Sequence, residues 1–179
     1  PYDRLEARAW ALENMAGVAN VVAPTFTSDL QEPNEAGIRH DIRLEIESGF
    51  WGTLLISETA TTNQEYVTFV RWAREEAGDR LRLLHHASHN SLEENIEVAR
   101  ATQACGAELV LLAYPPTFYP RDEEDLYGYT RNFCDAIDMA VMIFPVPLWG
   151  FERIHPSAGF SPGLIERLLD DVPNIVAIK

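Results

Sequence analysis

Leu109-Val110-Leu111-Leu112-Ala113 is a short, continuous apolar run that ends at Tyr114 and a pair of prolines. Five other runs along the chain are equally short and rich in apolar and β-branched residues, which is typical of buried strands. The runs recur roughly every 30 residues, which is the size of one strand followed by one helix. The six runs are residues 18–24, 53–57, 81–86, 109–114, 140–144 and 175–179.

Segments with helical periodicity separate these runs, and capping signals support several of them. Ser91 precedes Glu94 at the spacing of a capping box, Gly106 stands where a helix would end, and Ser161 precedes Pro162. Strands that alternate with helices predict a parallel sheet. The predicted helices cover residues 35–48, 65–77, 91–105, 123–136 and 161–170, with a lead-in helix at 4–15.

Such a parallel sheet is either open and doubly wound or closed into a barrel. No glycine-rich nucleotide-binding loop follows any of the runs, which argues against the open sheet. The expected fold class is therefore α/β, a parallel (β/α)8 TIM barrel, of which the chain supplies a lead-in helix and about six βα units. A barrel needs eight units, and a free sixth strand would expose its edge. We therefore expect residues 1–179 to be a single barrel domain that is incomplete at its C-terminal end.

Charge and hydropathy restrict the partners. Asp and Glu number 28 against 14 Lys and Arg, so the formal net charge is -14, which repels nucleic acid and anionic lipid surfaces. No apolar window reaches the roughly 18 residues of a membrane span, and the first residues lack the pattern of a secretory signal. We expect a cytoplasmic protein that acts on a small molecule, with neither nucleic-acid nor membrane partners.

Polar side chains gather directly after the predicted strands, at the end where barrel enzymes carry their active sites. Strand alternation sends His85 and His86 to opposite faces, so at most one of them is expected to face the barrel interior. The candidates at this rim are Thr25, Thr27, Ser57, Glu58, Thr59, His85, His86, Tyr114, Trp149 and Lys179.

The order of several motifs resembles that of the dihydrodipicolinate synthase and N-acetylneuraminate lyase family. The matching pieces are A-P-T-F at 23–26, G-F-W-G at 49–52, G-A-E at 106–108, P-V-P at 145–147 and N-I-V-A-I-K at 174–179. The resemblance implies a class I aldolase that forms a Schiff base with pyruvate through Lys179, needs no cofactor beyond this covalent imine, and assembles as a homotetramer. Desolvation at the end of an apolar strand would favour the neutral amine that attacks a carbonyl.

The family usually carries two tyrosines of a proton relay, and both are absent here. Phe144 replaces the tyrosine of the Tyr-Asn-Val-Pro motif, and the Pro-Tyr-Tyr motif is altered around Tyr114. Because a phenyl ring cannot carry a proton, proton transfer is expected to fall to His85, His86, Glu58 or Tyr114.

Two further departures concern the substrate. The Gly-Thr-Thr-Gly-Glu loop that holds the keto acid carboxylate in the family reads S-E-T-A-T-T at 57–62, where Ser57 and Thr59 either donate to a carboxylate or cap the next helix. Glu58 would repel the substrate there unless it acts as an acid or base. The arginine that grips a second carboxylate is missing, which favours an apolar or aromatic aldehyde, as in hydratase-aldolases. Phe144 and Trp149 are then substrate-binding candidates.

Two alternatives stay open. His85, His89 and His155 with a carboxylate would suit a metal-dependent barrel hydrolase, although their spacing matches no familiar ligand motif. A barrel that keeps Lys179 but has lost turnover would instead serve as a binding or oligomeric scaffold.

Overall fold

The structure is a computed structural model, and it describes residues 2–115, 117–146 and 149–179. Three residues of the altered motifs after the fourth and fifth strands, Pro116, Pro147 and Leu148, lie outside the described residues. In chain order the elements are η1 (Arg4–Glu6), α1 (Ala7–Asn14), β1 (Ala19–Val22), α2 (Glu35–Glu47), β2 (Gly52–Leu55), α3 (Asn63–Ala77), β3 (Arg82–Ala87), α4 (Leu92–Ala104), β4 (Leu109–Leu112), α5 (Glu123–Asp135), β5 (Ala140–Ile143), α6 (Phe151–Ile154), α7 (Pro162–Asp171) and β6 (Ile175–Ile178).

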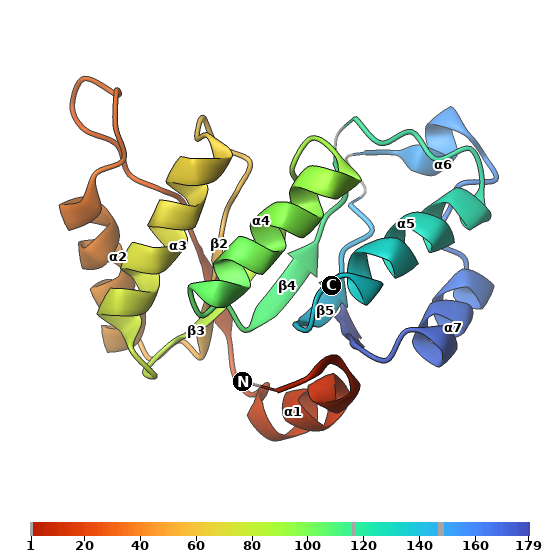
Figure 1. The fold of residues 1–179 in the computed structure, drawn as a ribbon, viewed down its shortest axis with the longest axis horizontal. Coiled ribbons are helices and arrows are strands. Elements are labelled where there is room, and N and C mark those ends of the chain that lie inside the picture. The colour runs from red at the N-terminus through yellow and green to blue at the C-terminus, as the bar shows by residue number, and fades with distance from the viewer. Residues whose placement is uncertain (1, 116, 147–148) are drawn as a thin grey trace.

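The strands form one parallel sheet in the order β1-β2-β3-β4-β5-β6, so each strand pairs with the one before it along the chain. Helices α2, α3, α4 and α5 lie side by side in front of the strands, and α1 lies beneath them (Figure 1). This order is what successive right-handed βα units produce. The predicted strands and the alternation with helices are confirmed, and β1 and β6 are the edges of the described sheet.

Local sequence explains where the helices begin and which face they bury. The hydroxyl of Thr62 accepts from the backbone of Glu65, whose carboxylate returns to the backbone of Thr62, so α3 starts with a full capping box. Ser91 and Ser161 cap α4 and α7, each accepting from a backbone N–H three residues on. The capping box expected at Ser91 is not completed, because the carboxylate of Glu94 accepts from the backbone of Asn90 instead. Helix α3 then buries a stripe at helical spacing against the sheet. The stripe is Tyr66, Phe69, Val70, Ala73 and Ala77.

Helix α6 is absent from the sequence prediction. It is a single turn of four residues, and Gly150 precedes it with a left-handed backbone (φ 55°). A segment this short carries no measurable apolar period, so only the packing of the loop after β5 decides that it is helical.

Strand side chains alternate between two apolar layers. The outer layer lies between the sheet and its helices and includes Leu55, Leu83 and Val110. The inner layer is formed by Leu54, Leu84, Leu109, Leu111 and Ala140, and it is closed from below by Ala7 and Trp10 of α1. The inner layer therefore corresponds to the barrel interior, and it ends upward at the carboxyl ends of the strands. Within the described ranges, no helix is both long and apolar enough to cross a membrane.

Candidate active site

Lys179 directly follows β6 at the carboxyl end of the sheet. Its backbone N–H donates to the carbonyl oxygen of Ile143 (3.0 Å), which extends the pairing of β6 with β5 by one residue. Its Nζ lies 4.1 Å from the ring centroid of Phe144, a contact in the range of a cation–π interaction. Because Phe144 packs against the inner layer, the amine lies on the interior side of the sheet. The side chain is exposed at this edge of the described sheet.

His86 reaches the same interior face from β3. It pairs with Leu111, a residue of the inner layer, and is almost fully buried at 5% exposure. Its Nδ1 accepts from the backbone N–H of Ser57 (3.3 Å) and lies 3.2 Å from the Ser57 hydroxyl. Burial lowers the pKa of His86, the charge of Glu58 raises it, and the charge of Lys179 lowers it. His86 and Ser57 are thus in contact at this end of the strands, and the charge of Lys179 acts on the pKa of His86.

His85 lies on the opposite face of β3, between the sheet and α3. Its Nδ1 is 3.2 Å from the hydroxyl of Tyr66, which also donates to the carbonyl oxygen of Leu55 (2.8 Å). The prediction that only one of the two adjacent histidines faces the interior is therefore confirmed. The helix-side position separates His85 from Lys179, so the structure brings His86 alone of this pair to the candidate site.

Tyr114 also points to the helix side, with a backbone in the left-handed region (φ 65°). Its hydroxyl is 2.6 Å from the hydroxyl of Thr130, and burial raises its pKa. The ring packs among Phe118, Tyr129 and Phe151 in an aromatic cluster on the helix side of the sheet. The structure does not bring Tyr114 to Lys179, because its side chain, in the loop after β4, is buried against Thr130 of α5.

Four of the five residues expected to bind the substrate, Ser57, Glu58, Thr59 and Trp149, line a hollow of about 520 Å³ at the rim, whereas Phe144, like His86 and Lys179, lies outside its described lining. Ser88 donates to a carboxylate oxygen of Glu58 (2.7 Å), and the indole N–H of Trp149 donates to the carbonyl oxygen of Ala113 (2.7 Å). Sequence reasoning missed Ser88 and Asn90, although both directly follow β3, where rim residues are to be sought. The lining residues are Ser57, Glu58, Thr59, Ala60, Thr61, Asn63, Ser88, His89, Asn90 and Trp149.

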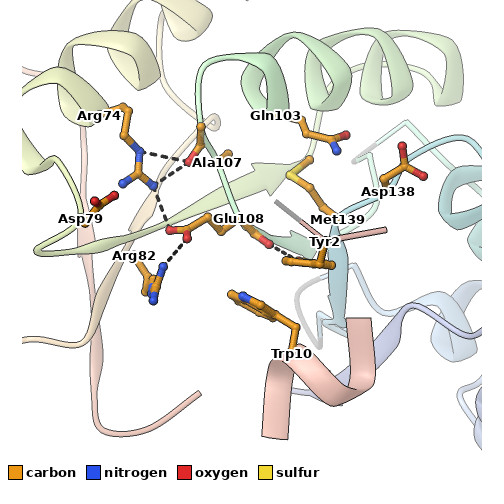
Figure 2. A pocket seen from close by; sticks show the side chains of 11 residues that line it. Tyr2, Trp10, Arg74, Asp79, Arg82, Gln103, Ala107, Glu108, Asp138 and Met139 are labelled. Carbon is orange, nitrogen blue, oxygen red and sulfur yellow. Dashed lines mark hydrogen bonds and ion pairs between the residues drawn. The ribbon is translucent and has the colours of Figure 1, made fainter. Parts of the chain in front are cut away.

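A second hollow, of about 380 Å³, lies at the opposite end of the strands (Figure 2). Tyr2 stacks on Trp10 with ring centroids 4.6 Å apart, and Glu108 binds both Arg74 and Arg82. Arg74, Arg82 and Glu108 thus bind one another. The hollow opens at the amino ends of β3 to β5, away from Lys179. It therefore lies at the end of the barrel that contributes to stability, opposite the end where barrel enzymes carry their active sites.

Comparison with known proteins decides the family. The sequence model described as "Dihydrodipicolinate synthetase family" matches residues 14–179, which is nearly the whole chain. The chain belongs to the dihydrodipicolinate synthetase family. Among the relatives of this family, "4-hydroxy-tetrahydrodipicolinate synthase" from Chlorobium phaeobacteroides (strain BS1) is 28% identical over 170 residues, covering 92% of this chain and 54% of that protein.

Solved structures of dihydrodipicolinate synthetase relatives share the fold. N-acetylneuraminate lyase from Fusobacterium nucleatum superposes with a TM-score of 0.77 at 18% identity, covering 92% of this chain and 55% of that one. YagE, a prophage protein from E. coli K12 solved in complex with pyruvate, gives a TM-score of 0.78 at 22% identity, covering 91% and 53%. The predicted barrel class is confirmed, and the chain spans about half the length of the relatives it matches.

The metal-dependent hydrolase has no support in this dihydrodipicolinate synthetase member. His85 and His89 stack with ring centroids 5.8 Å apart, each on the helix side of the rim. Within residues 2–115, 117–146 and 149–179, no three side chains of the metal-ligating types gather at one point. His155, the third predicted ligand, follows α6 and joins no such group.

The buried histidines make the stability of the fold sensitive to acid. Burial lowers the pKa of His89 from 6.5 to about 4. As the pH falls through this window, the unfolded chain binds a proton that the folded chain does not, so the free energy of unfolding falls. We expect His89 to account for a loss of about 2 kcal/mol between pH 7 and pH 5, measured by urea unfolding of the full-length protein.

His89→Gln should remove this part of the acid sensitivity. His40→Gln, at an exposed position of α2, is the matched control and should keep the wild-type pH dependence. Equal acid sensitivity of the two variants would show that His89 is not the titrating group.

Proposed function

We propose that the protein is a class I aldolase or lyase that forms a Schiff base between Lys179 and pyruvate or a related 2-keto acid. The observation that carries the proposal is the position of the Lys179 amine on the interior side of the rim, 4.1 Å from the Phe144 ring centroid, in a chain of this family. The relatives' pyruvate complex supports the same substrate class.

The proposed reaction begins at the side-chain amine of Lys179. Neutral Lys179 adds to the keto carbon, and loss of water leaves an imine, which is protonated. In the cleavage direction the imine is that of a 4-hydroxy-2-keto acid. A base removes the proton of the 4-hydroxyl group, the bond between C3 and C4 breaks, and its electron pair moves to the protonated imine, so an aldehyde departs and the enamine of pyruvate remains. Protonation of the enamine carbon and hydrolysis then release the keto acid and free Lys179. The imine itself is the electron sink, so the proposal includes no cofactor.

The second substrate is proposed to be an aldehyde without a second carboxylate. Apart from Ala60 and Trp149, every residue that lines the rim hollow carries a polar side chain, and none of these is Lys or Arg. The indole of Trp149 suits the aromatic aldehyde expected from the sequence, whereas the surrounding hydroxyls and amides suit a hydroxylated one. Product formation from pyruvate with benzaldehyde or with glyceraldehyde would separate these two candidates.

The proposal also covers the oligomeric state of the protein and its location in the cell. By its resemblance to the family, the full-length protein is proposed to be a homotetramer that works in the cytoplasm on small molecules.

Borohydride trapping tests the Schiff base. The full-length protein is incubated with pyruvate, reduced with borohydride and digested, and the peptide that contains Lys179 is examined by mass spectrometry. We expect an adduct with the mass of reduced pyruvate on Lys179, because borohydride reduces an imine to a stable secondary amine. Lys179→Arg should show no adduct. Absence of any adduct with pyruvate and with longer 2-keto acids would rule out the aldolase proposal.

A further inference from the structure

The hydrogen bonds of His86 determine which of its ring nitrogens carries a proton. The backbone N–H of Ser57 donates to Nδ1 of His86 (3.3 Å), and a backbone N–H cannot accept. Nδ1 must therefore hold a lone pair, to which the Ser57 hydroxyl at 3.2 Å is able to donate as well. Burial keeps the pKa of His86 below its ordinary value, so the ring is neutral near pH 7 and its single proton lies on Nε2.

The protonated nitrogen is free to bind a ligand. No described residue accepts a hydrogen bond from Nε2 of His86. Nε2 of His85 and Nε2 of His89 also make no hydrogen bond, but both of these atoms are buried away from solvent. Nε2 of His86 is not one of the buried atoms without a hydrogen bond. Because His86 pairs with Leu111 on the inner layer, its free N–H lies on the same side of the sheet as the Lys179 amine.

We propose that Nε2–H of His86 donates a hydrogen bond to the carboxylate of the keto acid bound at Lys179, and that Ser57 is the positioning residue that holds the required tautomer. This inference rests on the proposed function and names the group that recognises its substrate. It gives His86 a role in binding, in contrast to the proton transfer expected from the sequence.

The electrostatics of the site fit a neutral donor. A second cation beside Lys179 would be disfavoured, and the effect of the Lys179 charge on His86 has this sign. A carboxylate bound between them receives a charge-assisted hydrogen bond from the imidazole and the attraction of the protonated imine. Glu58 is exposed, and its carboxylate accepts a hydrogen bond from Ser88, so it provides no hydrogen-bond donor for an anionic substrate. His86 therefore adds a neutral donor beside the altered loop at 57–62.

Two variants of His86 test the position of the donor. The side-chain amide nitrogen of glutamine reaches about as far as Nε2, whereas that of asparagine reaches only about as far as Nδ1. The assay is exchange of the pyruvate methyl hydrogens with deuterium in heavy water, which needs the enamine but no aldehyde. We expect His86→Asn to raise the pyruvate concentration at half-maximal rate by roughly 10- to 100-fold, and His86→Gln by less than about 5-fold, with similar maximal rates.

Several outcomes would overturn the inference. Equal half-saturating concentrations in the wild type and in His86→Asn would show that His86 does not hold the carboxylate. A lower maximal rate with unchanged half-saturation would assign proton transfer to His86 instead. Nitrogen-15 NMR of the imidazole checks the tautomer without any turnover, and a proton found on Nδ1 would contradict the role given to Ser57.

The failure of this inference is distinguishable from failure of the proposed function. In Lys179→Arg, which cannot form the imine, added pyruvate should still shift the Nε2–H signal of His86. A shift there without a borohydride adduct in the wild type would refute the aldolase and keep the anion site. An adduct in the wild type without any effect of either His86 variant would refute the anion site and keep the aldolase.

Discussion

Lys179→Arg is expected to lower the rate of pyruvate methyl exchange by about 1,000-fold or more in the full-length protein. Arginine keeps the positive charge above the Phe144 ring, but its guanidinium is not nucleophilic at neutral pH and cannot form the imine. Without the imine, the methyl proton must be removed from free pyruvate, whose carbonyl is a much weaker electron sink. The measurement is proton NMR of pyruvate in heavy water with equal amounts of wild type and variant.

Two measurements test whether the loss of exchange comes from the missing imine. The circular dichroism spectrum and thermal midpoint of Lys179→Arg should match the wild type, because arginine keeps the positive charge and the backbone bond of residue 179 to Ile143 is retained. A variant that folds normally and keeps more than about a tenth of the wild-type exchange rate would contradict a Schiff base at this residue.

Phe69→Ala is expected to cost about 3 to 5 kcal/mol of unfolding free energy. Phe69 has no exposed surface, and its ring meets the edge of Tyr66 at a centroid distance of 6.2 Å in the layer between α3 and the sheet. Removing the ring loses its burial and leaves a cavity that rigid strands cannot close. Urea unfolding at fixed protein concentration measures the change.

Arg71→Ala is the matched control for Phe69→Ala on the same helix. Arg71 is exposed on the outer face of α3, two residues further along, and its replacement should change the free energy of unfolding by less than about 0.5 kcal/mol. Similar losses in both variants would mean that alanine substitution in α3 acts through the helix itself, and would contradict the cavity explanation.

The fold was predictable because each signal was local and repeated. Runs such as 109–113 are apolar without interruption, and capping residues such as Ser91 and Ser161 lie at the predicted helix starts. Six strands in sequential parallel order then follow from the general rules of βα units. Helix α6 was missed because one turn after Gly150 has no period that a sequence can display.

The candidate site was only partly predictable. Lys179 was found by its strand-end position and its family motif, and the structure places it on the interior side beside Phe144. Tyr114 and His85 also follow apolar runs, but their side chains belong to the helix side, where Thr130 and Tyr66 meet their polar atoms. Ser88 was overlooked because a serine after a strand is common, and only its contact with Glu58 distinguishes it.

By itself, the sequence determined the barrel class and the family and singled out Lys179 as the candidate nucleophile, since these depend on apolar period, motif order and residue identity along the chain. Tertiary structure decided which side chains share the interior. Strand parity and register set His86 apart from His85, and the turn after β2 carries the backbone N–H of Ser57 to Nδ1 of His86. Such a contact joins residues 29 positions apart. It exists only when two strands are packed side by side, so no local pattern records it.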